Sequence, residues 1–124
     1  MAGQNHHFAH YAPEQIPYAV ERYVNETNRL YGVLDRRLRD RSFIAGDYSI
    51  ADIACYPWIR LHERQRQSLA EFSAIARWFA SLSERPAVRR AYEIAEKINT
   101  MPTVTEEAKR QLFGQTAKTA TGRR

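Results

Sequence analysis

The sequence predicts an all-α fold in which several helices pack around one hydrophobic core. Apolar residues recur at spacings of three and four through most of residues 16–98, which is the period of a helix with one buried side. Ser49 and Asp52 have the spacing of a capping box, a device that starts a helix. With 124 residues, 44% of them hydrophobic and 27% charged, the chain is long enough for one domain with its own core.

The first part of the chain predicts the end of one helix and the whole of a second. Residues 1–12 have the character of the last turns of a helix whose beginning we expect upstream of Met1. Pro13 and Pro17 mark the start of the next helix, because proline is well tolerated in a first turn. This helix runs to about Arg39, and its apolar side consists of Ile16, Val20, Tyr23, Thr27, Leu30, Leu34 and Leu38.

The segment from Gly46 to Leu61 predicts the central, buried helix of the bundle. The Ser49 hydroxyl can accept from the amide of residue 52, and the Asp52 carboxylate can reach back to the amide of Ser49. Capping explains Asp52 better than general acid–base catalysis does, because no second acid shares its side of the helix. The side that we expect to be buried consists of Ile50, Ile53, Ala54, Pro57, Trp58 and Leu61.

Two more helices complete the predicted bundle, and a tail follows. One helix runs to about Ser83, with Trp78 flanking an apolar stripe, and the next begins at Pro86. Within the tail, residues 105–113 predict one short helix, and the closing residues AKTATGRR are expected to be mobile. We therefore divide the chain into a helical domain, residues 1–98, and a tail, residues 99–124. The apolar stripe of the helix that ends at about Ser83 consists of Phe72, Ile75, Phe79 and Leu82. That of the helix that begins at Pro86 consists of Val88, Ala91, Tyr92, Ala95 and Ile98.

Composition argues against several classes of protein. The formal net charge is +5, but the basic residues are dispersed among acids, so a nucleic-acid surface is the less favoured interpretation. No apolar run approaches the length of a membrane span. The N-terminus lacks a signal-peptide pattern, and the single cysteine, Cys55, agrees with a reducing compartment, so we expect a cytoplasmic location. Cys55 has no cationic neighbour in the sequence and is interpreted as a packed thiol.

The histidines near the N-terminus are the only residues that suggest a metal. His6 and His10 lie one helical turn apart, as do His7 and His10, and such pairs can chelate. The sequence supplies no obvious third ligand and no glutamate in the arrangement of a metalloprotease helix. We therefore predict no metal site, and interpret these residues as hydrogen-bonding histidines beside a cleft or an interface.

Three segments resemble a known family. The run AGDYSIADIACYPW resembles the capped core helix in the C-terminal domain of glutathione S-transferases. The runs GQNHHFAHYAPEQIPYAVERY and ETNRLYGVLDRRL are similar to the bacterial Nu-class group, the glutathione-dependent disulfide-bond oxidoreductases. The resemblance covers about residues 1–98 and implies the helical bundle of a glutathione S-transferase C-terminal domain. The family places a thioredoxin-like domain ahead of this bundle, and we expect that domain to be missing from the present chain.

The resemblance implies which residues meet the substrates. Nu-class enzymes reduce disulfides with glutathione as cosubstrate, and their thioredoxin-like half holds most of the tripeptide. By this resemblance Asn5 and Arg29 would reach glutathione, Arg29 through the carboxylates. Tyr11 and Trp58 would line the wall for a disulfide or electrophilic substrate. The helical half would also supply much of the contact of a homodimer.

Three hypotheses of function therefore stay open. The first is the helical domain of a glutathione-dependent transferase or disulfide-bond reductase, inactive without the thioredoxin-like domain. The second is a stand-alone helical scaffold for association between proteins, and the third is a basic helical protein that binds nucleic acid. On the first hypothesis, we expect the isolated chain to bind glutathione weakly or not at all. An apolar patch left exposed would then promote self-association.

Overall fold

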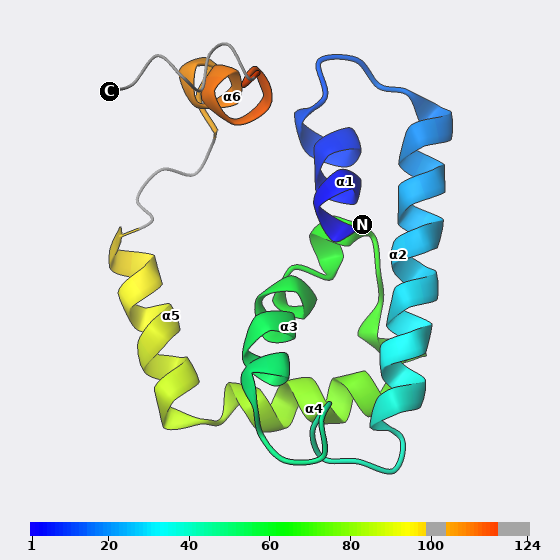
Figure 1. Cartoon of the computed structure of the whole chain (residues 1–124), viewed down its shortest axis with the longest axis vertical. Helices are drawn as coiled ribbons and strands as arrows, with labels where there is room; N and C mark the ends of the chain where they lie inside the picture. Colours follow the sequence, from blue (N-terminus) through cyan, green and yellow to red (C-terminus); the bar gives the residue numbers. More distant parts are fainter. Residues whose placement is uncertain (99–103, 117–124) are drawn as a thin grey trace. The chain divides into compact units, whose positions relative to one another are not determined.

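The computed structural model describes residues 1–98 and 104–116, and these residues form helices and no strand. The prediction of an all-α fold is therefore confirmed. Close contacts group the chain into two units, Met1–Arg89 and Arg90–Arg124, whereas the sequence placed a boundary after residue 98. The α-helices are α1 (Ala2–His6), α2 (Pro17–Leu38), α3 (Ile50–Arg60), α4 (Ser73–Ser83), α5 (Pro86–Ile98) and α6 (Glu106–Phe113) (Figure 1). Shorter pieces are the π-helical turn η1 (His7–Tyr11) and the 3₁₀ turns η2 (Glu63–Gln65) and η3 (Leu69–Glu71).

The hydrophobic core lies in the first unit, where α4 crosses the ends of α2 and α3 (Figure 1). The long helix α2 packs against both α1 and α4, and α4 packs against α3. The arrangement is a bundle with α4 as the shared partner of its two neighbours. Its buried hydrophobic side chains are Val20, Tyr31, Leu38, Tyr56, Ile59, Phe72, Ala74, Ile75, Trp78 and Leu82.

The predicted long helix is confirmed as α2, but its buried side differs in part from the prediction. Val20, Thr27 and Leu38 are buried as expected. Ile16 precedes the first helical residue and is exposed, so it does not belong to the stripe. Tyr31, which the stripe omitted, is buried because its ring packs on Phe72, with 5.5 Å between the ring centroids.

The capping box at the start of α3 is confirmed in both directions. The Ser49 amide donates to Asp52 Oδ2 at 3.0 Å, and the Ala51 amide donates to Ser49 Oγ at 3.3 Å. The carboxylate also accepts from outside the helix, because the Ile44 amide and the Trp78 indole reach Asp52 Oδ1 at 3.0 and 2.8 Å. Asp52 is fully buried, so it joins α3 to the preceding loop and to α4 as well as capping the helix.

The side of α3 that faces the core was predicted wrongly. The buried residues of this helix are Asp52, Tyr56 and Ile59, which follow helical spacing on another side. Tyr56 stacks on Phe79 of α4, with 5.0 Å between the ring centroids. Apolar spacing identifies a water-avoiding side but does not identify the helix that covers it, and here α4 packs on the side that carries the capping carboxylate. The predicted side is exposed along its length: Ile50, Ile53, Ala54, Pro57, Trp58 and Leu61.

Trp78 is central to the core and does not merely flank the stripe of α4. Only 1% of its surface is exposed, and it heads the largest fully buried side chains of the described residues. Its ring packs against Tyr56, with 6.2 Å between the ring centroids, while its indole nitrogen donates to Asp52. The predicted helix end at Ser83 is confirmed.

The start of α4 is capped by a residue of α2. Phe72 at the N-cap position offers no side-chain acceptor. Instead Asp35 Oδ1 accepts from the amides of Ala74 and Ile75 at 2.9 and 3.2 Å. A carboxylate at this end of a helix also interacts favourably with the helix dipole. One side chain thus satisfies two amides that the helix itself leaves without partners.

We expect Asp35→Ala to lower the free energy of unfolding by about 1–2 kcal/mol, the usual cost of a lost helix cap. Urea unfolding followed by circular dichroism measures this difference. The matched control is Asp40→Ala, because Asp40 is exposed and follows the end of α2. Equal stability of the two variants would contradict the assignment of Asp35 as the cap of α4.

The second unit contains the short helix that the tail predicted. Thr105 caps α6 by accepting from the Ala108 amide at 3.1 Å, and Lys109 pairs with Glu106 at 2.7 Å. The predicted helix from Pro86 is confirmed as α5, which contributes no buried side chain. The closing residues AKTATGRR, residues 117–124, were predicted to be mobile and lie outside the described residues.

Candidate functional site

Asn5 lies inside the first unit and fastens α1 to the rest of it. Only 1% of its surface is exposed. Its Nδ2 atom donates to Thr27 Oγ1 and to the backbone oxygen of Gln65, both at 3.1 Å. The Oδ1 atom of Asn5 has no hydrogen-bond partner in the described part of the chain. This position orients α1, and a contact of Asn5 with glutathione stays a prediction.

Two glutamines extend this buried network, and the sequence reasoning missed both. Gln65 accepts from the Tyr31 hydroxyl at 2.8 Å and donates to the Trp58 carbonyl at 2.9 Å. Gln67 donates to the Val24 carbonyl at 3.2 Å, and burial raises the pKa of Tyr31. These bonds join residues far apart in the sequence, and isolated glutamines in the run ERQRQ give no periodic signal for them. The network fixes the segment after α3 against α2.

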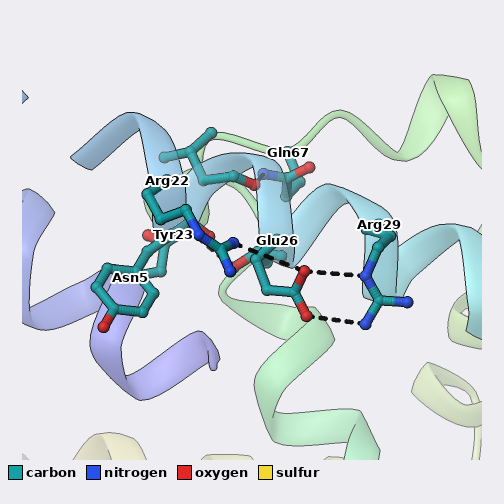
Figure 2. Close-up of polar contacts among 8 residues, drawn as sticks. Asn5, Arg22, Tyr23, Glu26, Arg29 and Gln67 are labelled. Atoms are coloured by element: carbon teal, nitrogen blue, oxygen red, sulfur yellow. Dashed lines mark hydrogen bonds and ion pairs between the residues drawn. The ribbon is translucent and has the colours of Figure 1, made fainter. Parts of the chain in front are cut away.

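Arg29 lies in an ion pair on the surface of α2. Its Nε and Nη2 atoms donate to the two carboxylate oxygens of Glu26 at 2.9 and 2.8 Å. Figure 2 shows Glu26 between Arg29 and Arg22, whose nearest nitrogen is 3.9 Å from the carboxylate. The hydrogen bonds from Arg29 lower the pKa of Glu26. The Arg29 side chain is 60% exposed, so it remains accessible to a ligand carboxylate that replaces Glu26.

Tyr11 and Trp58 lie on a second surface, which we call the aromatic face and define as His10, Tyr11, Trp58 and Arg64. Arg64 Nη2 donates to the Tyr11 hydroxyl at 3.3 Å, and the Arg64 carbonyl lies 2.7 Å from His10 Nε2. The His6 ring lies between Trp58 and His10, 6.1 and 6.0 Å from them by ring centroids. Trp58 is 47% exposed.

The π-helical turn η1 carries His10 and Tyr11 of the aromatic face. Such turns are rare and occur frequently at functional sites. An exposed indole can contact planar groups of a ligand, and the guanidinium beside the Tyr11 hydroxyl can contact anionic groups. Of this face, the sequence singled out Tyr11, Trp58 and the histidine, whereas Arg64 was counted only among the dispersed basic residues.

His6 is buried beneath the aromatic face. Its Nε2 atom has no hydrogen-bond partner in the described residues. Burial, with smaller contributions from the charges of Arg64 and His10, lowers the pKa of His6 below 6.5. The folded protein therefore holds this ring neutral at a pH where the unfolded chain already binds a proton.

The consequence is a loss of stability on mild acidification. Because the folded pKa of His6 lies below the unfolded value of 6.5, stability is retained above that pH and falls as the pH drops through it. We expect the free energy of unfolding in urea to decrease between about pH 7.5 and about pH 5.5. His6→Phe should flatten this slope and His7→Phe should keep it. Equal slopes for the parent and His6→Phe would contradict the assignment.

Neither a reactive thiol nor a metal cluster is found in the described part of the chain. Burial, and next the Asp52 carboxylate, raises the pKa of the Cys55 thiol, which favours the protonated, less reactive form. The described residues contain no group of three or more histidine, cysteine or acidic side chains that could hold a metal. No helix among them combines the length and the apolar character that crossing a membrane requires.

An all-helical unit built on a carboxylate-capped helix is the arrangement that the family resemblance implied. Residues 4–86 match the family model of the glutathione S-transferase C-terminal domain, and the chain belongs to this family. It is 52% identical over 92 residues to the disulfide-bond oxidoreductase YfcG of Escherichia coli (strain K12), and 38% identical over 98 residues to YghU of the same organism. These matches cover 73% of the chain but 43% and 34% of the two relatives, so the chain spans less than half their length.

Solved structures agree with this assignment. A glutathione transferase from Phanerochaete chrysosporium, in complex with oxidized glutathione, matches with a TM-score of 0.72 and 34% identity. That match covers 79% of the present chain and 47% of the other. A glutathione transferase from Burkholderia graminis, with two glutathione molecules per subunit, matches with a TM-score of 0.64 and 38% identity over 72% of this chain and 40% of the other.

Proposed function

We propose that this chain is the helical part of a glutathione-dependent disulfide-bond reductase. The observation that carries the proposal is the 52% identity to the disulfide-bond oxidoreductase YfcG over 92 residues. In the complete enzyme a thioredoxin-like domain holds most of the glutathione, and the helical part supplies one wall of the cleft and much of the contact of a homodimer. The isolated chain is then inactive. We keep a cytoplasmic location as part of the proposal, because disulfide reduction by glutathione needs a reducing compartment.

The aromatic face is the wall that we assign to the acceptor, a disulfide or an electrophile. Trp58 and Tyr11 offer aromatic surface, and Arg64 offers a cation beside Tyr11. Arg29 serves the glutathione carboxylates by exchanging one carboxylate partner, Glu26, for another. Asn5 acts from beneath by holding α1 in place.

A chimera tests the proposal. The thioredoxin-like part of YfcG is joined ahead of this chain, and the reduction of a small disulfide by glutathione is followed. We expect the chimera to be active and the isolated 124-residue chain to be inactive, with weak or no glutathione binding in calorimetry. An inactive but folded chimera, or tight binding of glutathione by the isolated chain, would refute this division of roles.

Single substitutions in the active chimera then test the residues. Trp58→Ala should raise KM for the disulfide and leave KM for glutathione unchanged, whereas Arg29→Ala should raise KM for glutathione. Loss of a charge-assisted hydrogen bond of this kind costs about 1.5–3 kcal/mol, about tenfold or more in kcat/KM. The matched control is Arg36→Ala, an exposed arginine further along α2. Equal effects of Arg29→Ala and Arg36→Ala would remove Arg29 from the site.

The alternative function is a helical scaffold for association between proteins. The exposed apolar side of α3 favours it, because Ile50 and Ile53 are 83% and 55% exposed. Such a surface promotes self-association. Sedimentation measures the oligomeric state of the isolated chain and of its Ile53→Glu variant. Together with the activity of the chimera, this result distinguishes the two functions. A stable oligomer that Ile53→Glu dissociates, together with an inactive chimera, would favour the scaffold.

A further inference from the structure

A cleft at the start of α2 is lined neither by residues of the aromatic face nor by Arg29. Its volume is about 400 Å³, within the range of about 300–1,000 Å³ that is usual for small-molecule pockets. We propose that this cleft binds the zwitterionic α-amino acid group of a small ligand, with Arg66 holding the carboxylate and Glu21 the ammonium group. The proposal requires neither the thioredoxin-like domain nor the disulfide reduction proposed above. The cleft is lined by Gln15, Pro17, Val20, Glu21, Val24, Asn25 and Arg66.

The backbone of Arg66 is the first observation that points to this cleft. Arg66 ends the turn η2 in the left-handed conformation, with φ 58° and ψ 40°, and is the one non-glycine residue with positive φ among the described residues. Its amide donates to the Glu63 carbonyl, and the Gln67 amide donates to the His62 carbonyl, both at 2.9 Å. Glycine is the usual residue at such a helix end, because a side chain is disfavoured there. An unfavourable conformation retained in this way is characteristic of functional positions.

The neighbours of Arg66 keep it beside α2. Gln65 and Gln67 on either side are both buried. Gln67 donates to the Val24 carbonyl at 3.2 Å and accepts from Asn28 Nδ2 at 3.0 Å. Figure 2 shows Gln67 against α2. Arg66 between them is exposed and lines the cleft. The turn η2 and the residues after it therefore bury Gln65 and Gln67 against α2 and leave the Arg66 side chain at the cleft, where a ligand can reach it.

The charges around the cleft select the kind of ligand. Arg22 and Arg29 both pair with Glu26 (Figure 2). Neither Glu21 nor Arg66 forms a salt bridge among the residues that the structure describes. A plain anion would be repelled by Glu21, and a plain cation by Arg66. A zwitterion satisfies both, because a guanidinium binds a carboxylate through paired hydrogen bonds and a carboxylate binds an ammonium group.

The rest of the lining agrees with an amino acid. Val20 and Val24 offer an apolar wall for an aliphatic side chain, and Asn25 and Gln15 supply amides that can hydrogen-bond the α-amino acid group. Two sources carry this group: a free amino acid, and the γ-glutamyl end of glutathione. Both are therefore used as probes, with leucine as the free amino acid.

Titration of the full 124-residue chain, observed through its backbone amide resonances, tests the proposal. We expect L-leucine to shift the amides that line the cleft. N-acetyl-L-leucine lacks the ammonium group and L-leucinamide lacks the carboxylate, so each should bind about tenfold more weakly or worse, the effect of one lost charge-assisted hydrogen bond. If glutathione shifts the same amides, the natural ligand group is the γ-glutamyl end of glutathione. If leucine shifts them and glutathione does not, the ligand is a free amino acid. Equal binding of leucine and its two blocked forms, or no shift with any probe, overturns the proposal.

Variants assign the binding to the two charged groups. Arg66→Gly removes the guanidinium and the backbone strain together, so leucine affinity should fall tenfold or more while Tm stays the same or rises. Glu21→Gln should weaken leucine as much, but should strengthen N-acetyl-L-leucine, because that anion is repelled by the Glu21 carboxylate. Arg36→Ala is the matched control for a lost positive charge. Unchanged leucine affinity in both Arg66→Gly and Glu21→Gln overturns the proposal. This measurement does not depend on whether the chimera described above is active.

Discussion

Replacing Asp52 with alanine should lower the free energy of unfolding by about 3–5 kcal/mol, one of the two largest effects that we expect in this chain. The substitution removes the acceptor of three donors: the Ile44 amide, the Ser49 amide and the Trp78 indole. Each buried donor left without a partner costs about 1–3 kcal/mol. Chemical unfolding followed by circular dichroism measures the loss.

Asp52→Asn is the informative companion. The amide keeps one acceptor oxygen but turns its nitrogen toward a donor, so we expect a loss between those of the parent and Asp52→Ala. Asp47→Ala in the preceding loop is the control, since Asp47 is exposed. A loss for Asp52→Ala as small as that of the control would show that the carboxylate is not the acceptor described above.

The same carboxylate makes stability depend on pH in acid. Burial alone raises the pKa of Asp52, but the hydrogen bonds from Ile44, Trp78 and Ser49 outweigh burial and lower the pKa below its ordinary value of 3.8. The stabilisation is therefore fully present above pH 3.8 and is lost as the pH falls through the lower, folded value. Asp52→Asn should remove this part of the acid transition.

Replacement by alanine should destabilise the protein much more at Trp78 than at Trp58. Trp78→Ala should cost about 3–5 kcal/mol, because it leaves a large cavity in the core. Trp58→Ala should cost less than about 1 kcal/mol, because half of that ring is already in water. The exposed fractions are 1% for Trp78 and 47% for Trp58. Urea unfolding of the two variants under one set of conditions is the measurement.

Trp78→Phe separates packing from hydrogen bonding. It keeps an aromatic ring in the core and removes the donor to Asp52, so its cost should fall between zero and that of Trp78→Ala. Equal losses for Trp58→Ala and Trp78→Ala would contradict the arrangement of α3 on α4. If Trp58→Ala changes stability little, a change of KM in that variant can be attributed to the wall proposed for the acceptor and not to unfolding.

The helices and the cap were accessible from the sequence because both depend on neighbours along the chain. The spacing of Ser49 and Asp52, and the stripes of α2 and α4, were sufficient to place their helices. Which side of α3 is covered depends on where α4 packs, and no local pattern carries that information. Apolar spacing therefore selected Trp58 for the core, whereas the structure buries Trp78.

Sequence reasoning reached residues of the candidate site only through the family resemblance, and their roles stay predictions. Tyr11 and Trp58 came from that resemblance, and the structure places both on the aromatic face with Arg64. The contacts of Gln65 and Gln67 were missed, because hydrogen bonds between distant polar side chains leave no periodic trace in a sequence. The left-handed backbone of Arg66 was missed for a different reason. A sequence normally indicates such a position by a glycine, and here the residue is arginine.

The bond between Asn5 and the Gln65 carbonyl has a consequence for the order of folding. It closes a loop of 60 residues, and closing so long a loop costs more entropy than pairing within a hairpin. Residues 1–11 should therefore attach only after the turn at Glu63–Gln65 exists, and they should be among the first to detach. Amide hydrogen exchange should show weaker protection there than in α4, so the part of the aromatic face that carries His10 and Tyr11 should form last and open first.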